Sequence, residues 1–123
     1  MGVDAYSPPE LHVVGVLNVD LTWEATYRCD GYDVAICLEV VEHLDPIMGP
    51  KMIDGLARAR RVLFSGATPG QPGVDHVNCR PHDYWHGLFA QHKMHPTHVG
   101  PLFAGTSVAD FYQRNMYLYE RPA

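Results

Sequence analysis

Short apolar runs alternate with amphipathic segments along the first half of the chain. Leu11–Val19 and Tyr32–Val41 are rich in β-branched and other apolar residues, and both predict strands. The second run is nearly continuous, which is typical of a central parallel strand buried on both faces. Lys51–Arg60 has apolar residues at helical spacing and predicts a helix, and Arg61–Ala67 predicts the next strand.

The alternation continues in the second half of the chain after a loop. The residues TPGQPG, 68–73, are a strong loop signal because Pro and Gly recur within a few positions. A helix is predicted over Arg80–His92, with Pro81 near its start. Thr97–Phe103 predicts a strand with a weak pattern, and Phe111–Arg121 predicts a terminal strand.

This order of elements predicts one α/β domain over residues 1–123. Strands separated by helices predict a mostly parallel sheet, and the two consecutive strands at the end predict an antiparallel C-terminal strand. A length of 123 residues is that of a single domain. The 46% of hydrophobic and 19% of charged residues form a globular composition.

Charge and composition narrow the classes of function. The net charge is −5 and the nine Lys and Arg residues are scattered, so a nucleic-acid partner is not favoured. There is no secretory signal, no apolar run long enough for a membrane span, and no pair spacing among the three cysteines. We therefore expect a cytoplasmic protein without membrane contacts. The eight histidines are unusual, and they direct attention to metal binding and proton transfer.

Polar residues gather where two of the predicted strands end. In open parallel sheets, ligands bind beyond the carboxyl ends of the strands. The first strand's end carries Glu39, Glu42 and His43, and His76 follows the next strand on its loop. The spacing i, i+3, i+4 places the first three on one side of a helical turn, where together with His76 they would hold Mg, Mn, Fe or Zn. The alternative is that Glu42 and His43 only cap or brace the start of a helix.

Other reactive residue types have simpler interpretations. His82 and His86 are spaced i, i+4 but lack the Glu of a zinc-protease motif, so we assign them to the face of a surface helix. Cys37 lies within the buried strand and is assigned to the core. Cys79 lies on the loop near the site, but no base accompanies it that would make it a nucleophile.

Several segments of the chain resemble one known family. YDVAICLEVVEHL, residues 32–44, closely resembles the fourth strand of class I S-adenosylmethionine-dependent methyltransferases. RVLFSGATPGQPGVDHVNCRPHDYWHGLFAQH, residues 61–92, resembles the fifth strand of that family with its loop and following helix. FYQRNMYLY, residues 111–119, is similar to the last strand. The resemblance extends from Gly2 to Arg121 and implies a Rossmann-like sheet that binds S-adenosylmethionine.

The resemblance also implies roles for individual positions. The implied cofactor-binding residues are Asp4 for the ribose, Asp20 and Leu21 for the adenine, and Cys37, Leu38 and Glu39 beneath the methyl donor. The implied metal ligands resemble those of small-RNA 2′-O-methyltransferases and are Glu39, Glu42, His43 and His76, with Mg or Mn as the ion.

The sequence departs from the family pattern at its amino-terminal side. The family's first strand and its GxGxG loop, whose backbone approaches the methionine end of the cofactor, are missing. In the family's sheet the first strand lies between the second and fourth strands, so its loss would leave two strand edges without partners. Three arrangements would resolve this: the sheet closes up, a second copy fills the gap in a homo-oligomer, or an N-terminal partner on another polypeptide completes the domain.

The function that the resemblance implies is methyl transfer from S-adenosylmethionine to an oxygen or nitrogen of a small-molecule or sugar acceptor. His43 or His76 would act as general base, or a metal ion would lower the pKa of the acceptor hydroxyl. Tyr84 and Trp85 would line the acceptor pocket. One alternative is a non-catalytic remnant or fragment with a binding or regulatory role, which the missing glycine loop favours. The other is a metal-dependent hydrolase or lyase, which the histidine count favours.

Overall fold

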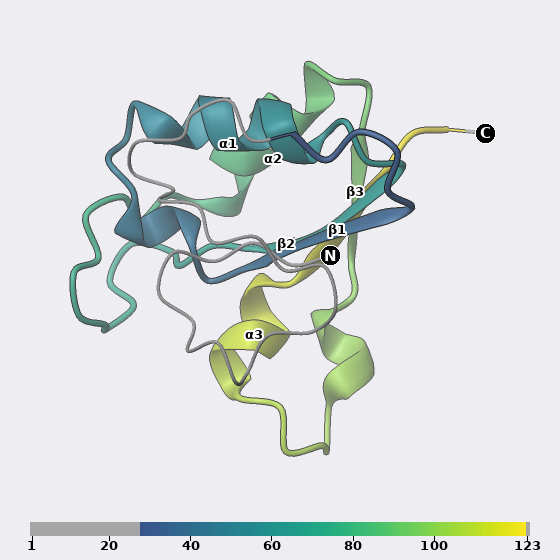
Figure 1. Cartoon of the computed structure of the whole chain (residues 1–123). Coiled ribbons are helices and arrows are strands. Elements are labelled where there is room, and N and C mark those ends of the chain that lie inside the picture. Colours follow the sequence, from purple (N-terminus) through teal and green to yellow (C-terminus); the bar gives the residue numbers. More distant parts are fainter. Residues whose placement is uncertain (1–27, 123) are drawn as a thin grey trace, which may run out of the picture.

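Four short strands form one open, mixed sheet in the computed structural model, which describes residues 28–122 (Figure 1). In the order in which they lie side by side, the strands are β1 (Val34–Leu38), β2 (Arg61–Ser65), β4 (Tyr117–Glu120) and β3 (His95–His98). The predictions for the Leu11–Val19 strand and for Asp4, Asp20 and Leu21 lie outside the described residues.

The directions of the strands agree with the α/β class predicted from the sequence. β1 and β2 are parallel, with Ile36 opposite Leu63. β4 lies between β2 and β3 and is antiparallel to both. Three strands therefore run one way and the C-terminal strand runs the other way, as predicted. The position of β4 between β2 and β3 has no signal in the hydrophobic pattern.

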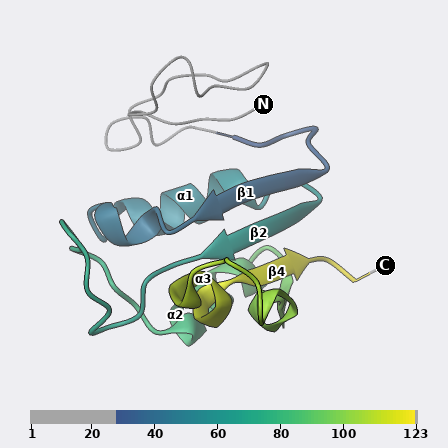
Figure 2. The same cartoon turned by 90° about the horizontal axis from the view of Figure 1, so that it is seen from below.

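Helices lie on both faces of the sheet (Figures 1 and 2). α1 (Met48–Leu56) and α2 (His82–Ala90) cover one face, and the short α3 (Asp110–Asn115) lies on the other. Two 3₁₀ helices, Val41–His43 and Gly100–Phe103, follow β1 and β3. Within residues 28–122, no helix has the length and apolar character needed to cross a membrane.

The core lies between the sheet and the pair α1 and α2, and aromatic rings form its centre. The ring of Phe64 on β2 lies 5.4 Å from that of Trp85 and 5.3 Å from that of Phe89. Phe89 stacks on Tyr119 of β4 at 3.8 Å. Trp85 and Phe89 are one helical turn apart on α2 and are 1% and 0% exposed. Their burial fixes α2 on the sheet, and with it the end of the loop that precedes α2.

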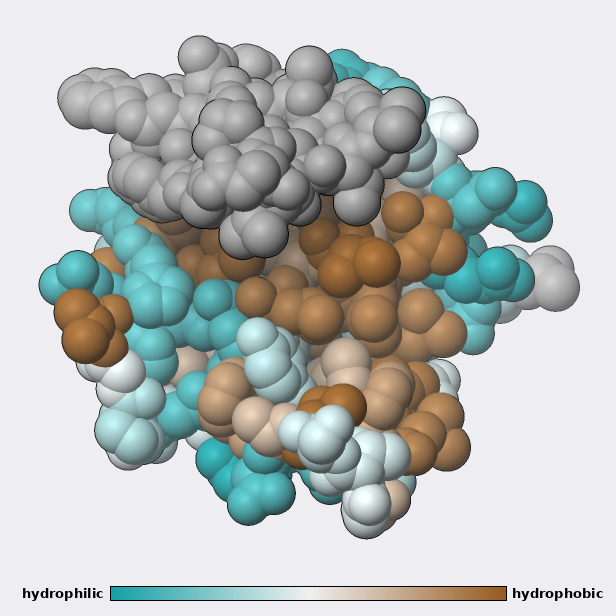
Figure 3. All heavy atoms as spheres, turned by 60° about the horizontal axis from the view of Figure 1, so that its bottom comes forward, coloured by the Kyte–Doolittle hydropathy of each residue, from teal (hydrophilic) through white to brown (hydrophobic). Residues whose placement is uncertain are grey.

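The face of β1 that points away from α1 and α2 is exposed among the described residues. Alternate strand residues point to opposite faces, so Ala35 and Cys37 point into the core while Val34 and Ile36 point away from it. Val34 is 44% exposed and Ile36 is 66% exposed. Figure 3 shows apolar side chains on the side of the molecule away from α1 and α2. The prediction of a strand buried on both faces is therefore wrong for β1.

Some element boundaries also differ from the predicted ones. The strand predicted over Tyr32–Val41 ends at Leu38, because Glu39 has a positive φ of 53° and leaves the extended conformation. The predicted helix Lys51–Arg60 begins earlier, at Met48, because Pro50 falls in the first turn, where its missing N–H has no helical partner to lose.

Two predicted strands prove to be partly helical. Thr97–Phe103 divides between the end of β3 and a 3₁₀ helix. Phe111–Arg121 divides between α3 and β4. The residues FYQRN begin with two adjacent apolar positions followed by polar ones, so only the later YLYE keeps the alternation of a strand.

The contact between the 3₁₀ helix Gly100–Phe103 and α3 provides a test of the fold. A methyl group added at Gly100 would overlap the backbone carbonyl of Gln113, which cannot move without shifting α3. We expect Gly100→Ala to lower the free energy of unfolding by about 1–3 kcal/mol, measured by urea titration.

The matched control is Gly87→Ala in α2, where a methyl group meets nothing within 4 Å. This substitution should raise the free energy of unfolding by about 1 kcal/mol, because alanine favours a helix interior. Equal stability of the Gly100→Ala variant and the unchanged protein would contradict the observed packing of α3.

Candidate functional site

A cleft with a volume of about 390 Å³ opens at the carboxyl end of β1. Its walls come from three segments far apart in the sequence: the residues after β1, the loop after β2, and α3. The lining side chains and backbone belong to Glu39, Glu42, His43, Gln71, Pro72, Gly73, Val74, His76, Phe111, Tyr112 and Arg114. The cleft therefore lies at the sheet edge that the sequence predicts for a site.

Glu39 is held in place where β1 ends. Its backbone N–H donates to both the carbonyl oxygen and the hydroxyl oxygen of Ser65, each at 3.0 Å. The φ of 53° is unusual for a residue with a side chain, and such conformations concentrate at functional sites. Oε1 of the carboxylate accepts a hydrogen bond of 2.8 Å from Nε2 of Gln71. Oε2 is buried and has no hydrogen-bond partner within residues 28–122.

Glu42 is the most unusual residue of the cleft. It is 0% exposed, and neither carboxylate oxygen has a hydrogen-bond partner among the described residues. Burial raises its pKa from 4.5 to about 7, the charge of Glu39 adds to this effect, and the amides of Glu42 and Ala67 offset part of it. A carboxylate in this position attracts either a proton or a cation.

The backbone of Glu42 also places His76. Its carbonyl oxygen accepts hydrogen bonds from the N–H groups of Val77 at 2.8 Å and Asn78 at 3.0 Å. These two bonds draw the loop after β2 across the end of β1. Nδ1 of His76 lies 3.3 Å from the carbonyl oxygen of Gln71. With the proton on Nδ1, that nitrogen donates to the carbonyl and the lone pair of Nε2 is free for a ligand.

Three of the four predicted metal ligands come together in this way. One ligand atom each from Glu42, His43 and His76 lies within 4.8 Å of the others. The rings of His43 and His76 are 4.8 Å apart and nearly perpendicular. Glu39 lines the same cleft but is not part of this group. One carboxylate and two imidazoles suit Mn, Fe or Zn, and three protein ligands leave positions open for a substrate.

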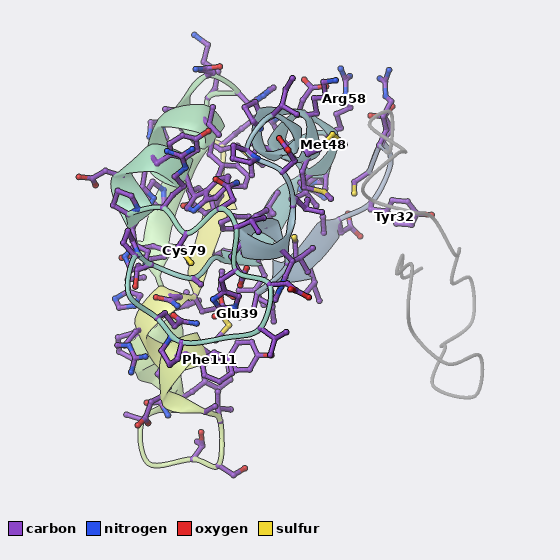
Figure 4. All side chains as sticks on the ribbon, turned by 90° about the vertical axis from the view of Figure 1, so that its left-hand side faces the viewer. Tyr32, Glu39, Met48, Arg58, Cys79 and Phe111 are labelled. Carbon is purple, nitrogen blue, oxygen red and sulfur yellow. The ribbon has the colours of Figure 1, made fainter. Side chains whose placement is uncertain are left out.

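The opposite wall consists of residues that the sequence analysis did not identify. Phe111 and Tyr112 are adjacent on α3 with their rings 4.4 Å apart, and Arg114 follows them. Figure 4 shows Glu39 and Phe111 facing the same region from opposite elements. Because this segment was predicted to be a strand, nothing in the pattern indicated that consecutive aromatic residues would face one cleft.

The two aromatic residues predicted for the acceptor lie elsewhere. Trp85 is 1% exposed and its ring is part of the core, so it cannot line an open pocket. Tyr84 is half-buried beside Trp85, and the guanidinium of Arg80 lies 4.9 Å from its ring centre. Neither residue is among those that line the cleft.

The cysteines are structural in the described part of the chain. Cys29 and Cys37 are buried, and Cys79 is half-buried. Burial raises the pKa of Cys37 to about 12, with a smaller contribution from the charge of Glu42. Its thiol therefore stays protonated at neutral pH and is unsuited to nucleophilic attack. This confirms its assignment to the core, while its position on β1 just before Leu38 and Glu39 leaves it near the cleft.

His82 and His86 do not belong to the metal-ligand group, but they are more than surface residues. Both are half-buried and face β4. Nδ1 of His86 lies 2.7 Å from the hydroxyl of Tyr119, and Nε2 of His82 lies 3.0 Å from Oδ1 of Asn115. Burial lowers the pKa of His86, and the neighbouring His82 adds to this shift. The two residues thus lie on one face of the helix α2, as predicted, and that face is turned toward β4.

A larger cleft of about 690 Å³ lies at the other end of the strands. Its charged residues are already paired. Arg61 forms an ion pair of 2.9 Å with Glu120, and Arg121 donates to the backbone carbonyls of Ala57 and Ala59. The cleft at the carboxyl end of β1, which contains the unpartnered carboxylate, is therefore the better candidate for chemistry.

Comparison with known proteins does not assign the chain to a family. No family model matches the chain, and no curated protein matches it. Functional arguments therefore depend on the geometry of the cleft and on the motif resemblance of its segments.

The buried carboxylate of Glu42 predicts a pH dependence of stability. The folded protein holds this proton more tightly than the unfolded chain, because the pKa is raised from 4.5 to about 7. The resulting stabilisation is complete below the unfolded pKa and is lost as pH rises through the folded pKa. In metal-free buffer, Glu42→Gln should remove this loss and be more stable than the unchanged protein at pH 8 by about 2–3 kcal/mol. Urea titrations at several pH values between 4 and 8 measure the difference, and parallel pH profiles would contradict it.

The contact between Gly73 and His76 predicts a selective effect on metal binding. A methyl group at Gly73 would overlap the His76 ring. We expect Gly73→Ala to displace this ring and weaken binding of Mn²⁺ or Zn²⁺, measured by calorimetry. Stability should change by no more than about 0.5 kcal/mol, because the loop is exposed and the ring can move. Gly87→Ala is the control, and unchanged metal affinity in Gly73→Ala would exclude His76 as a ligand.

Proposed function

We propose that this protein binds a divalent metal ion at Glu42, His43 and His76 and transfers a methyl group from S-adenosylmethionine to a small-molecule or sugar acceptor. The observation that carries the proposal is the buried, unpartnered carboxylate of Glu42 beside two imidazoles. These residues lie in the segments that resemble the fourth strand and the loop after the fifth strand of class I methyltransferases. A Rossmann-like sheet is part of the same proposal.

The donor side of the proposed site begins at the end of β1. In this proposal Cys37, Leu38 and Glu39 support the methyl donor from below, because they form the end of the strand and the turn that follows it. Asp4 contacts the ribose, and Asp20 with Leu21 contacts the adenine, as the resemblance implies. The donor is charged at sulfur, so the carboxylate of Glu39 would favour its binding near the cleft.

The acceptor side is the wall formed by α3. Phe111 and Tyr112 offer flat apolar surface on which an aromatic or sugar ring would lie. Arg114 is exposed at the mouth of the cleft and makes no ion pair with the described residues. An acidic protein with few basic residues favours a small acceptor over nucleic acid.

Methyl transfer is an in-line displacement, so the residues of the cleft act chiefly by positioning the two reactants. The acceptor oxygen or nitrogen attacks the methyl carbon, the carbon–sulfur bond breaks, and S-adenosylhomocysteine leaves. In the absence of a metal ion, His43 or His76 would take the proton of the acceptor. With the ion bound, both imidazoles would be its ligands, and the ion would instead supply Lewis-acid chemistry that lowers the pKa of an acceptor hydroxyl.

The alternative function is that of a non-catalytic domain that binds a partner or regulates a complete enzyme. In the described sheet β1 pairs only with β2, so its other edge is where a second copy or an N-terminal partner would add a strand. The free thiols of Cys37 and Cys79 are consistent with the cytoplasm as the compartment.

Calorimetry with S-adenosylhomocysteine, in the presence and absence of Mn²⁺ and Mg²⁺, tests the proposal. Micromolar binding that grows stronger with metal supports a methyltransferase. A folded protein that binds metal but not S-adenosylhomocysteine would support the non-catalytic domain instead. Light scattering on the same sample shows whether a second copy is present.

The double variant Glu42→Gln, His43→Ala tests the role of the metal. We expect it to abolish any dependence of S-adenosylhomocysteine binding or of turnover on Mn²⁺, because two of three ligands are lost. Binding without metal should persist, since neither residue is placed against the donor. A metal effect that survives in the double variant would place the ion elsewhere.

A further inference from the structure

A chain of hydrogen bonds connects α2 to the cleft through the interior of the protein. It begins at Tyr117 on β4, whose hydroxyl lies 3.3 Å from Nδ1 of His82 on α2. Nε2 of His82 lies 3.0 Å from Oδ1 of Asn115, the last residue of α3. Nδ2 of Asn115 lies 2.7 Å from Oε1 of Gln71 and 3.5 Å from Oε1 of Glu39. The chain therefore ends on the carboxylate at the end of β1.

Every group in this chain has a fixed direction as donor or acceptor. A carboxylate only accepts, so Nε2 of Gln71 donates to Glu39 and Oε1 of Gln71 is left to accept. Nδ2 of Asn115 donates to that oxygen, so Oδ1 of Asn115 must accept. His82 consequently donates from Nε2, and in the neutral ring Nδ1 accepts from the hydroxyl of Tyr117.

These hydrogen bonds hold one carboxylate oxygen of Glu39 and leave the other without a bond. Oε1 receives the bonds from Gln71 and Asn115, whereas Oε2 is buried without a partner. A side chain fixed at one oxygen cannot turn away from the cleft that it lines. The same network joins α2, α3 and the loop after β2, which have no other polar connection to Glu39 among the described residues.

A purely structural role accounts for this arrangement less well. Asn115 is 2% exposed, and an apolar side chain of similar size would fill its space without the cost of burying an amide. Its hydrogen bonds converge on a carboxylate with an unpartnered oxygen, beside a second carboxylate with two more. Oriented carboxylates with free oxygens are what a cation requires.

We propose that His82 and Asn115 are positioning residues that hold Glu39 as a second carboxylate beside the cation bound by Glu42, His43 and His76, where its charge strengthens cation binding without joining the ligand group. The proposal rests on the metal site proposed above and adds two residues that contact neither metal nor substrate. Their effect on the site passes through the carboxylate of Glu39 alone.

The test is Mn²⁺ affinity at one fixed pH, measured by calorimetry on the full chain. Asn115→Leu and His82→Leu should weaken binding by about 10-fold, the lower end of the range for residues that orient the groups around a metal. His82→Gln should retain most of the affinity, because its amide can donate to Asn115 in place of Nε2. His86→Leu is the matched control, since His86 is on the same helix and bonds to Tyr119 instead.

A double-mutant cycle separates positioning from general destabilisation. In a Glu39→Gln background, His82→Leu should cause no further loss of Mn²⁺ affinity, because the group through which it acts is already changed. His82 is half-buried, so this pair of variants is expected to fold even if Asn115→Leu does not. Equal losses in both backgrounds, or equal affinities of His82→Leu and His86→Leu, would overturn the positioning role.

The two proposals fail in different ways. If the unchanged protein binds Mn²⁺ no better than Glu42→Gln, the metal site itself is refuted, and the role of His82 and Asn115 with it. If the unchanged protein binds Mn²⁺ and Glu42→Gln does not, while His82→Leu retains full affinity, only the positioning role is refuted.

Discussion

An ionised carboxylate that is enclosed without a hydrogen-bond partner opposes folding, and the site of this protein is organised around one. Glu42 is fully buried with both oxygens unpartnered, and the buried Oε2 of Glu39 adds a third such oxygen. Burial penalises charge at Glu42 strongly enough to raise its pKa to about 7. A protein keeps such an arrangement where a proton or a cation completes it. The neighbouring imidazoles of His43 and His76 favour a metal cation.

The strand pairing brings these groups together. β1 and β2 are parallel, so the segments that follow them leave the sheet at the same edge. The carbonyl of Glu42 then accepts two N–H groups from the loop after β2, which carries His76 to the end of β1. α3 supplies the remaining wall because it directly precedes β4, which lies beside β2. One parallel pair and one inserted antiparallel strand thus determine which side chains meet in the cleft.

The sequence predicts the α/β class, the antiparallel last strand, α2, and the edge of the sheet where the site lies. These features depend on local periodicity and on the position of polar residues after strands. It does not predict α3, because six residues are too few for a helical period, nor the cleft wall of Phe111 and Tyr112 that depends on α3. It also wrongly predicts that Trp85 lines a pocket, whereas Trp85 lies in the core. An aromatic residue beside polar ones on a helix has the same sequence pattern whether it faces the core or a pocket. The bonds from His82 to Asn115 and on to Glu39 join residues 33 and 76 positions apart, beyond the reach of any local pattern.

The polar groups of the cleft also help to distinguish a ligand-binding site from a non-catalytic domain that has only kept the fold. A domain that only binds a partner would be stabilised by replacing Glu42 with an uncharged residue, and its cleft would need no oriented carboxylates. The described network does the reverse: it uses two amides, the half-buried Gln71 and the buried Asn115, in contacts that orient Glu39 and leave one of its oxygens without a partner among the described residues. Several neighbouring residues carry features that destabilise the fold, namely buried carboxylate oxygens without partners and a positive φ at Glu39. Such features concentrate at sites where a ligand offsets their cost. The geometry of this cleft is therefore explained more completely by the cation proposed above than by packing alone.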